Sequence, residues 1–152
     1  MSVPAKLRLV EEDRKAEYCL DEQVGFLLRK ANQRHLAIFA AEIADLTPPQ
    51  FAALARLYEV GQTSQNQLGQ LIAMDAATIK GVIDRLRARR LVALTPHVHD
   101  RRRLLVGLTA EGREAIEKLL PLARGITEKT LAPLTPREAA TLLRLLSKLA
   151  EG

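Results

Sequence analysis

The spacing of apolar residues predicts two helices in the first 60 positions of the chain. Over residues 21–44 apolar side chains recur three or four positions apart, with no proline and a single glycine. This is typical of one long helix with Asp21 as its N-cap. Thr47 then precedes two prolines and Gln50, the pattern of a capping box with proline at the first helical position. The second helix therefore begins after Thr47 and ends at Gly61.

Helical spacing returns after residue 109 and predicts two further helices. Thr109 is placed to cap a helix over residues 110–131. Pro121 falls inside this helix and is expected to kink it, because proline removes a backbone donor and crowds the preceding turn. Thr135 and Glu138, with Pro-Arg between them, form a second capping box that opens a final helix to about residue 150.

Residues 63–92 have the pattern of a helix-turn-helix. Ser64 can cap a short helix through residue 72, a break follows at residues 73–74, and Asp75 can cap a second helix to about residue 90. The small side chain at Gly69 lets the two helices approach closely at the turn. The two helices would face each other through apolar side chains, which are Leu68, Leu71, Ile72, Ile79, Val82, Ile83 and Leu86.

Two short apolar runs after this pair of helices predict a β-hairpin. Residues 91–94 and 104–108 alternate apolar positions, and a polar segment with three consecutive arginines joins them. The predicted order is therefore two helices, a helix-turn-helix, a hairpin and two more helices, which makes the fold mainly α. At 152 residues, the chain is long enough to bury one core.

The positive charge of the chain is concentrated in one segment. The formal net charge is +5, and residues 80–103 hold eight Lys or Arg against two Asp. The rest of the chain holds 15 basic and 16 acidic residues. Solvated surfaces usually mix the two signs, so this block indicates a polyanionic partner such as nucleic acid.

Other classes of protein find little support in the residues. No apolar run approaches the roughly 18 residues of a membrane helix, and charges interrupt the first 15 positions, against a secretion signal. Cys19 is the only cysteine, so no internal disulfide is possible and a cytoplasmic protein is the simplest interpretation. No G-x-S-x-G, phosphate loop or G-x-G-x-x-G occurs. The chain is therefore predicted not to be an enzyme, and no cofactor is expected.

Three stretches together resemble the multiple antibiotic resistance regulator (MarR) family of bacterial transcription factors. They are LTPPQFAALARL, LGQLIAMDAATIKGVIDRL and HDRRRLLVGLTAEG, and the resemblance covers residues 21–150. It implies a homodimer that presents two winged helix-turn-helix regions to a pseudo-palindromic operator in double-stranded DNA. Residues 47–109 would form the DNA-binding region, and residues 1–46 and 110–152 the helical dimerisation region. The sequence departs from the family pattern at His97-Val98, where Asp-Pro is usual, at Arg103 and at Pro121.

The resemblance and the chemistry of the side chains select DNA-contact candidates. The first turn of the second helix of the pair should approach base edges, where small side chains permit close contact and Thr78 or Lys80 can donate hydrogen bonds. Arginines at the hairpin tip can enter the minor groove or pair phosphates, unless Asp100 holds one of them. The full set is Ser64, Gln65, Asn66, Asp75, Ala76, Ala77, Thr78, Lys80, Gly81, Arg85, His99, Asp100, Arg101, Arg102 and Arg103.

The stretches resemble most closely the family members that regulate catabolism of small aromatic acids, which implies an effector that releases DNA. Arg29 would pair the carboxylate of such an acid, His35 would bind a ring substituent, and Phe39 or Phe51 would pack the ring. Alternatively, Arg29 or His35 forms a dimer contact.

Three other interpretations remain open. The protein can be a constitutive DNA-binding protein with no effector. It can sense a metal through His97 and His99, although a third and fourth ligand are not evident, so no metal site is predicted. It can sense oxidation through Cys19, but no cationic cluster near that residue indicates a reactive thiolate.

Overall fold

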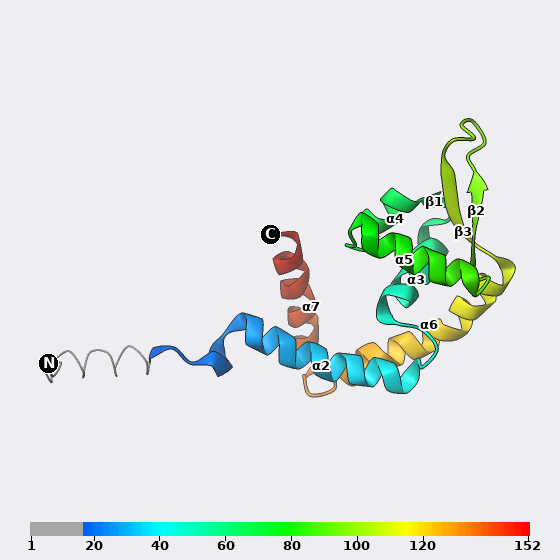
Figure 1. Cartoon of the computed structure of the whole chain (residues 1–152). Coiled ribbons are helices and arrows are strands. Elements are labelled where there is room, and N and C mark those ends of the chain that lie inside the picture. Colours follow the sequence, from blue (N-terminus) through cyan, green and yellow to red (C-terminus); the bar gives the residue numbers. More distant parts are fainter. Residues whose placement is uncertain (1–16) are drawn as a thin grey trace, which may run out of the picture. The chain divides into compact units, whose positions relative to one another are not determined.

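The structure is a computed structural model that describes residues 17–152 (Figure 1). The chain falls into two units, one up to His35 and one from Leu36 onwards. A 3₁₀ turn, η1 (Leu20–Glu22), precedes the helix α2 (Val24–Glu42), which runs from the first unit into the second.

The expected N-cap role of Asp21 is wrong, because Asp21 lies inside η1 and the long helix begins at Val24. Gln23 separates the two elements with an extended backbone, and its N–H donates to the carbonyl of Leu20. Its side-chain amide also donates to the carbonyl of Cys19 at 2.9 Å. These local hydrogen bonds satisfy backbone groups of the turn and interrupt the helix that the apolar spacing alone would extend.

The other three long helices lie where the sequence predicts them. They are α3 (Pro48–Val60), α6 (Ala110–Leu131) and α7 (Pro136–Glu151), and all three have a threonine N-cap. The capping boxes of α3 and α7 are both formed, with reciprocal bonds between Thr47 and Gln50 and between Thr135 and Glu138. The α6 helix continues through Pro121 as one element.

The predicted helix-turn-helix is confirmed as α4 (Gln65–Leu71) and α5 (Ala76–Ala88). At the turn, Ala73 has a φ of 56°, and the N–H of Met74 donates to the carbonyl of Gly69 at 2.8 Å. A Cβ at Gly69 would lie 3.0 Å from the Met74 carbonyl oxygen and 3.2 Å from a side-chain carbon of Ile79. Glycine is therefore required for the close approach of the two helices.

The predicted hairpin is confirmed as β2 (Val92–Pro96) and β3 (Leu104–Leu108), and a strand that the sequence did not predict joins it. The strand β1 (Thr63–Ser64) pairs with β3, so the antiparallel sheet has the order β1-β3-β2. Because β2 is an edge strand, it tolerates a proline at its end. Figure 1 shows the hairpin extending beyond the body formed by α3, α4 and α5.

The core of the second unit lies where α3, α4, α5, α6 and the sheet meet. The predicted apolar faces of the helix-turn-helix account for much of it, since five of their seven residues are buried and the other two, Leu71 and Ile72, are half-buried. The largest fully buried side chains are Leu54, Leu57, Leu68, Ile79, Ile83, Leu86, Ile116 and Val106.

The stretch HDRRRLLVGLTAEG ends in Leu108, Thr109 and Gly112, and the contacts at the junction between the hairpin and α6 explain the threonine and this glycine. Thr109 accepts the N–H of Gly112 as N-cap, donates its hydroxyl to the carbonyl of Arg90 at 2.7 Å, and donates its N–H to the carbonyl of Leu91. A Cβ at Gly112 would lie 1.9 Å from the Leu91 carbonyl oxygen. These contacts therefore fix the start of α6 against the end of α5 and the start of β2.

The α7 helix differs from the other long helices of the second unit, because none of its residues is buried. Five leucines on it are exposed, namely Leu142, Leu143, Leu145, Leu146 and Leu149. Among the helices that the structure describes, none is long and apolar enough to cross a membrane.

Candidate nucleic-acid interface

The first turn of α5 is held by Asp75. Its carboxylate accepts the backbone N–H of Thr78 at 2.7 Å. Hydrogen bonds from the backbone and the side chain of Thr78 lower the pKa of Asp75 below its ordinary value, because they stabilise the charged form. Asp75 thus acts as the N-cap that fixes the turn from which its neighbours project.

The outward face of α5 carries small side chains. Ala77 and Gly81 lie opposite the buried side chains of Ile79 and Ile83. A Cβ added at Gly81 would meet nothing within 4 Å, so the protein itself does not require glycine there. The other first-turn candidates, Ala76, Ala77, Thr78 and Lys80, are all exposed. This face leaves the helix backbone open to a partner.

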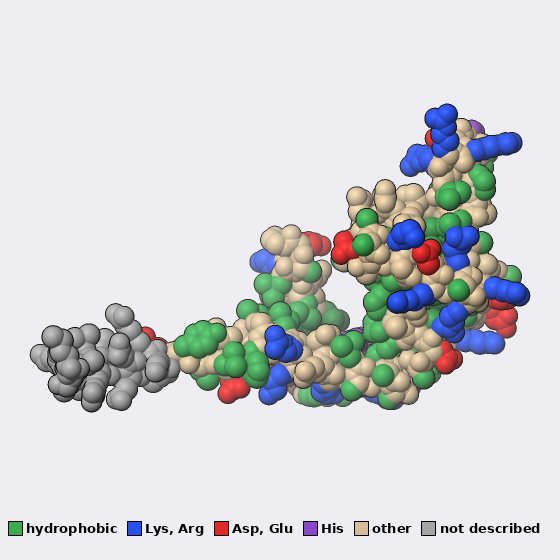
Figure 2. Space-filling view, viewed as in Figure 1, with side chains coloured by type: hydrophobic (Ala, Val, Ile, Leu, Met, Phe, Trp, Pro, Cys, Tyr) green, Lys and Arg blue, Asp and Glu red, His purple; other side chains and the backbone are tan. Residues whose placement is uncertain are grey.

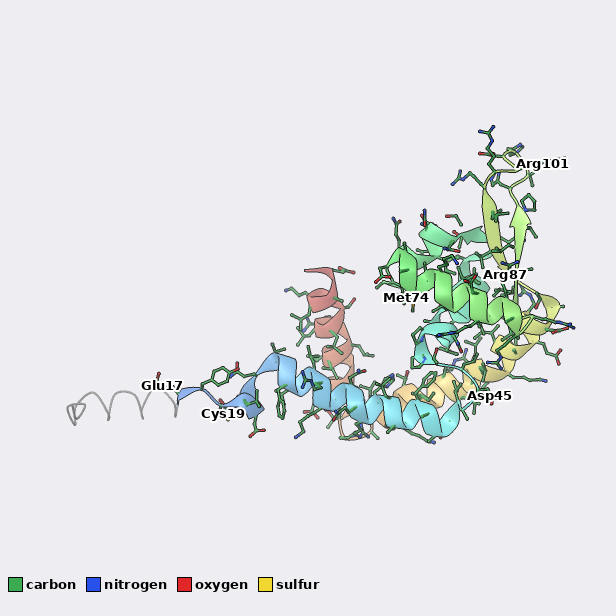
Figure 3. All side chains as sticks on the ribbon, in the orientation of Figure 1. Glu17, Cys19, Asp45, Met74, Arg87 and Arg101 are labelled. Atoms are coloured by element: carbon green, nitrogen blue, oxygen red, sulfur yellow. The ribbon has the colours of Figure 1, made fainter. Side chains whose placement is uncertain are left out.

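Charged side chains flank this face of α5. The Nζ of Lys80 lies 3.1 Å from a carboxylate oxygen of Asp84, and both side chains are more than half exposed. Such a pair contributes little to stability and can be exchanged for a phosphate contact. Arg85 is exposed and borders an open hollow of about 480 Å³ together with Asp45 and Arg89. Figure 3 shows Arg87 projecting from the same helix.

The tip of the hairpin, residues 97–103, is a turn held by four local hydrogen bonds, and we call it the wing tip. The N–H of His97 donates to the carbonyl of Arg103 at 2.8 Å, and the N–H of Arg103 donates to the carbonyl of Asp100 at 3.0 Å. The Asp100 carboxylate accepts the N–H of Arg102 at 3.0 Å, and His97 Nδ1 accepts the N–H of His99 at 3.1 Å. The side chains of Asp100 and His97 therefore shape the wing tip by accepting hydrogen bonds from backbone N–H groups.

In the part of the chain that the structure describes, no ion pair joins Asp100 to Arg101 or Arg102, and the Asp100 carboxylate accepts only the backbone N–H of Arg102. Within residues 17–152, Arg101, Arg102 and Arg103 form no side-chain hydrogen bond or ion pair. All three are exposed, and Figure 2 shows basic side chains gathered at the end of the hairpin. Arg101 lies at its far end in Figure 3. Three guanidinium groups are thus available to an external anion.

A polar hollow of about 500 Å³ lies between the start of α4 and the wing. It brings together the predicted residues Ser64, Gln65 and Asn66 with Arg102 and Arg103. None of the described residues that line it is acidic, so it suits a phosphate-rich strand. Gln67 and Gln70 also line this hollow. They were not among the residues predicted from the sequence, although the run SQNQLGQ places polar side chains along the same short helix.

The rings of the two wing histidines, His97 and His99, lie close together. The ring centroids of His97 and His99 are 5.8 Å apart. Within the described part of the chain, no three His, Cys, Asp or Glu side chains form a group that could hold a metal ion. Cys19 is half-buried.

The residues predicted to bind an effector belong to both units. Arg29 is exposed and His35 is half-buried in the first unit. In the second unit Phe39 is only 6% exposed and is part of the core, where its ring meets that of Phe51 edge-to-face with centroids 6.0 Å apart. Phe51 is half-buried, so of the two rings it is the more accessible.

Comparisons with known proteins point to one family. A family model described as "MarR family" matches residues 44–103. The chain is 43% identical over 137 residues to the HTH-type transcriptional repressor NicR of Pseudomonas putida, an alignment that covers 89% of this chain and 87% of the relative.

Two solved structures are also similar over most of the chain. A probable transcriptional regulator from Pseudomonas aeruginosa shares 52% identity with a TM-score of 0.82, covering 86% of this chain and 99% of that one. BpsR of Bordetella bronchiseptica, whose DNA binding is regulated by 6-hydroxynicotinic acid, shares 42% identity with a TM-score of 0.85, covering 89% and 98%.

Proposed function

The chain belongs to the MarR family, as its three sequence motifs predicted, and from this membership we propose that it is a ligand-responsive transcriptional repressor. It binds a pseudo-palindromic operator as a homodimer and works in the cytoplasm as a regulator rather than an enzyme. The observation that carries the proposal is the set of unpaired arginines, Arg101, Arg102 and Arg103, on a wing beside an exposed recognition helix.

The DNA-binding region is residues 47–109. The first turn of α5 enters the major groove, where Ala77 and Gly81 let base edges come close and Thr78 and Lys80 donate hydrogen bonds. The wing tip reaches the neighbouring minor groove or the phosphates beside it. Because each subunit reads one half-site, the two half-sites lie about one helical turn apart.

The dimerisation region is residues 1–46 and 110–152, of which residues 1–16 lie outside the described part of the chain. The exposed leucines of α7 support this part of the proposal, because contiguous exposed apolar surface on a soluble protein usually marks an interface. A twofold dimer buries the same surface of both subunits. The subunits would then present their α5 helices as a symmetric pair.

The effector is a small aromatic carboxylate that lowers DNA affinity. The similarity to BpsR supports this choice, since 6-hydroxynicotinic acid regulates DNA binding in that protein. Arg29 would pair the carboxylate, His35 would bind a ring substituent, and Phe39 or Phe51 would pack the ring.

The test is a DNA-release experiment. Fluorescence anisotropy with a labelled duplex from the region upstream of the gene should show tight binding, and 6-hydroxynicotinic acid or a related pyridine or benzene carboxylate should release the DNA. Arg29→Gln should keep DNA binding and lose release, whereas the neighbouring control Lys30→Gln should retain both. If no aromatic acid releases the DNA, the constitutive alternative is correct. If zinc alone releases it, the metal-sensing alternative is correct.

A further inference from the structure

A second pocket lies beneath the loop that joins α2 to α3, entirely within the second unit. It has a volume of about 310 Å³, within the range of small-molecule sites. Its walls come from the end of α2, the loop over residues 44–46, the end of the recognition helix and one side of α6. Its apolar floor includes Leu46, Leu91, Leu119 and Leu122, and its basic side chains are Arg89 and Lys118.

We propose that this pocket is a second binding site for a small aromatic carboxylate, distinct from the site that includes Arg29. The ring would lie on the leucine floor and the carboxylate would pair with Arg89. A flat ring gains from removing apolar carbon from water, and a guanidinium binds a carboxylate through two parallel hydrogen bonds. Its regulatory consequence rests on the proposed function, but binding itself does not.

The hydrogen bonding of Arg89 favours an incoming anion. Its guanidinium donates to the backbone carbonyl of Asp45, which is a neutral acceptor. Within residues 17–152 it forms no ion pair with a carboxylate. A hydrogen bond to an ionised acceptor is roughly twice as strong as one between neutral groups. A ligand carboxylate can therefore compete with the Asp45 carbonyl for Arg89.

The other charges around the pocket are mostly matched. Glu42 pairs with Lys129, and Lys118 lies 3.2 Å from Glu114 with both side chains mainly exposed. Asp45 also lines the pocket, and its negative charge disfavours an anion. This repulsion gives a direct test, because Asp45→Asn removes the negative charge and leaves the backbone carbonyl in place.

The position of Arg89 connects the pocket to DNA recognition. Arg89 is the C-cap of α5, and its side chain ties the end of the recognition helix to the α2–α3 loop. Arg89 also borders the hollow that is lined by Arg85 and Ala88. Figure 3 shows Asp45 on this loop, next to the end of α2. A ligand that binds Arg89 replaces its hydrogen bond to the Asp45 carbonyl, so the end of α5 is no longer held against the α2–α3 loop.

Calorimetry on the full-length protein without DNA tests the site. The probes are 6-hydroxynicotinic acid and benzoate. The proposal expects Arg89→Gln to remove one class of sites or weaken it at least tenfold, Ala115→Leu to block it by filling the pocket, and Asp45→Asn to strengthen it. Arg89→Lys should recover part of the affinity. Arg87→Gln, a change to an exposed arginine outside the pocket, is the control and should bind like the wild type.

The result that overturns the second site is clear. The second site is ruled out if the Arg89 and Ala115 variants bind the probes as the wild type does while Arg29→Gln abolishes all binding. It is also ruled out if the wild-type protein binds neither probe. The proposed function fails separately, if the wild-type protein does not bind duplex DNA. Folding of each variant is checked by its thermal transition, and Arg89→Lys keeps the test decisive if Arg89→Gln is unstable.

Discussion

The recognition helix and the wing tip are the two parts of the DNA-binding region, and they are stabilised in opposite ways. Four apolar residues of α5 are buried, Asp75 caps its first turn, and Lys80 pairs with Asp84. Within residues 17–152, the wing tip is shaped by local hydrogen bonds at Asp100, His97 and Arg103. The guanidinium groups of its three arginines form no hydrogen bond or ion pair in the described part of the chain.

This difference assigns different tasks to the two parts. A rigid helix with a small-residue face supplies a fixed shape, which is what discrimination between bases requires. Unpaired arginines on a projecting turn supply positive charge, which adds affinity for any sequence by releasing counterions. Variants in the two parts should separate these tasks, and both tasks depend on the junction between the hairpin and α6.

The largest effect is expected at Gly112, where the hairpin and α6 meet. Gly112→Ala would place a methyl group 1.9 Å from the Leu91 carbonyl oxygen, so the backbone must move. Overpacking of this kind typically costs about 1–3 kcal/mol and sometimes more. Urea unfolding should show this loss, and DNA binding should fall because the wing is no longer held against α5.

Gly125→Ala is the matched control on the same helix. A Cβ at Gly125 meets nothing within 4 Å, so alanine should stabilise the helix by up to about 1 kcal/mol through its higher propensity. Equal stability changes for the two variants would show that the close contact between Gly112 and Leu91 does not require glycine at position 112.

The next largest effect is expected from removing the wing charge. The triple change of Arg101, Arg102 and Arg103 to glutamine should weaken binding at least tenfold to operator and to unrelated duplex alike. The slope of log K against log salt should become shallower by about one for each phosphate that an arginine no longer neutralises. Arg124→Gln, an exposed arginine on α6, should change neither quantity. A weakening confined to the operator sequence would instead assign base reading to the wing.

A smaller and more selective effect is expected on the outward face of α5. Ala77→Leu adds bulk where base edges approach, and leucine is also a good helix former, so stability should hardly change. Affinity for the operator should fall about tenfold, consistent with the roughly 1–3 kcal/mol of a good base contact. Binding to unrelated DNA should be unaffected. A uniform weakening on both duplexes would remove the distinction between helix and wing.

The smallest effect concerns the cap of α5. Hydrogen bonds from Thr78 hold the pKa of Asp75 below its ordinary value in the folded state, so the charged cap stabilises the fold above about pH 4. This contribution is lost as the pH falls through the lowered pKa. NMR titration of the Asp75 carboxyl should show a midpoint below that of an exposed aspartate. A midpoint at the ordinary value would show that the cap is not formed in solution.

Features coded by neighbouring residues could be predicted from the sequence. The threonine caps join residues three positions apart, and the turn at Gly69 and the hairpin each join segments that follow each other directly along the chain. The prediction that Asp21 caps the long helix was wrong because Gln23, a residue with no strong capping preference, ends the 3₁₀ turn. The strand β1 could not be predicted, because two residues carry no alternation and pair only with the distant strand β3.

In the candidate site too, only the features that depend on neighbouring residues could be predicted from the sequence. Charge concentration and the family motif selected Arg101 to Arg103. The Asp100 carboxylate accepts the backbone N–H of Arg102 and forms no ion pair with a wing guanidinium, and no sequence pattern reveals this. The pocket at Arg89 joins residues from position 42 to position 122. Such a pocket emerges only when the helices are packed.

The salt dependence of DNA binding tests the central claim most directly. Affinity for a duplex from the region upstream of the gene would be measured by anisotropy between 50 and 200 mM salt, for the wild type and for the triple wing variant. The account predicts that wild-type affinity falls steeply, by about a hundredfold or more, and that the variant has a weaker affinity and a shallower slope. A wild-type affinity that hardly changes over this range would contradict the account.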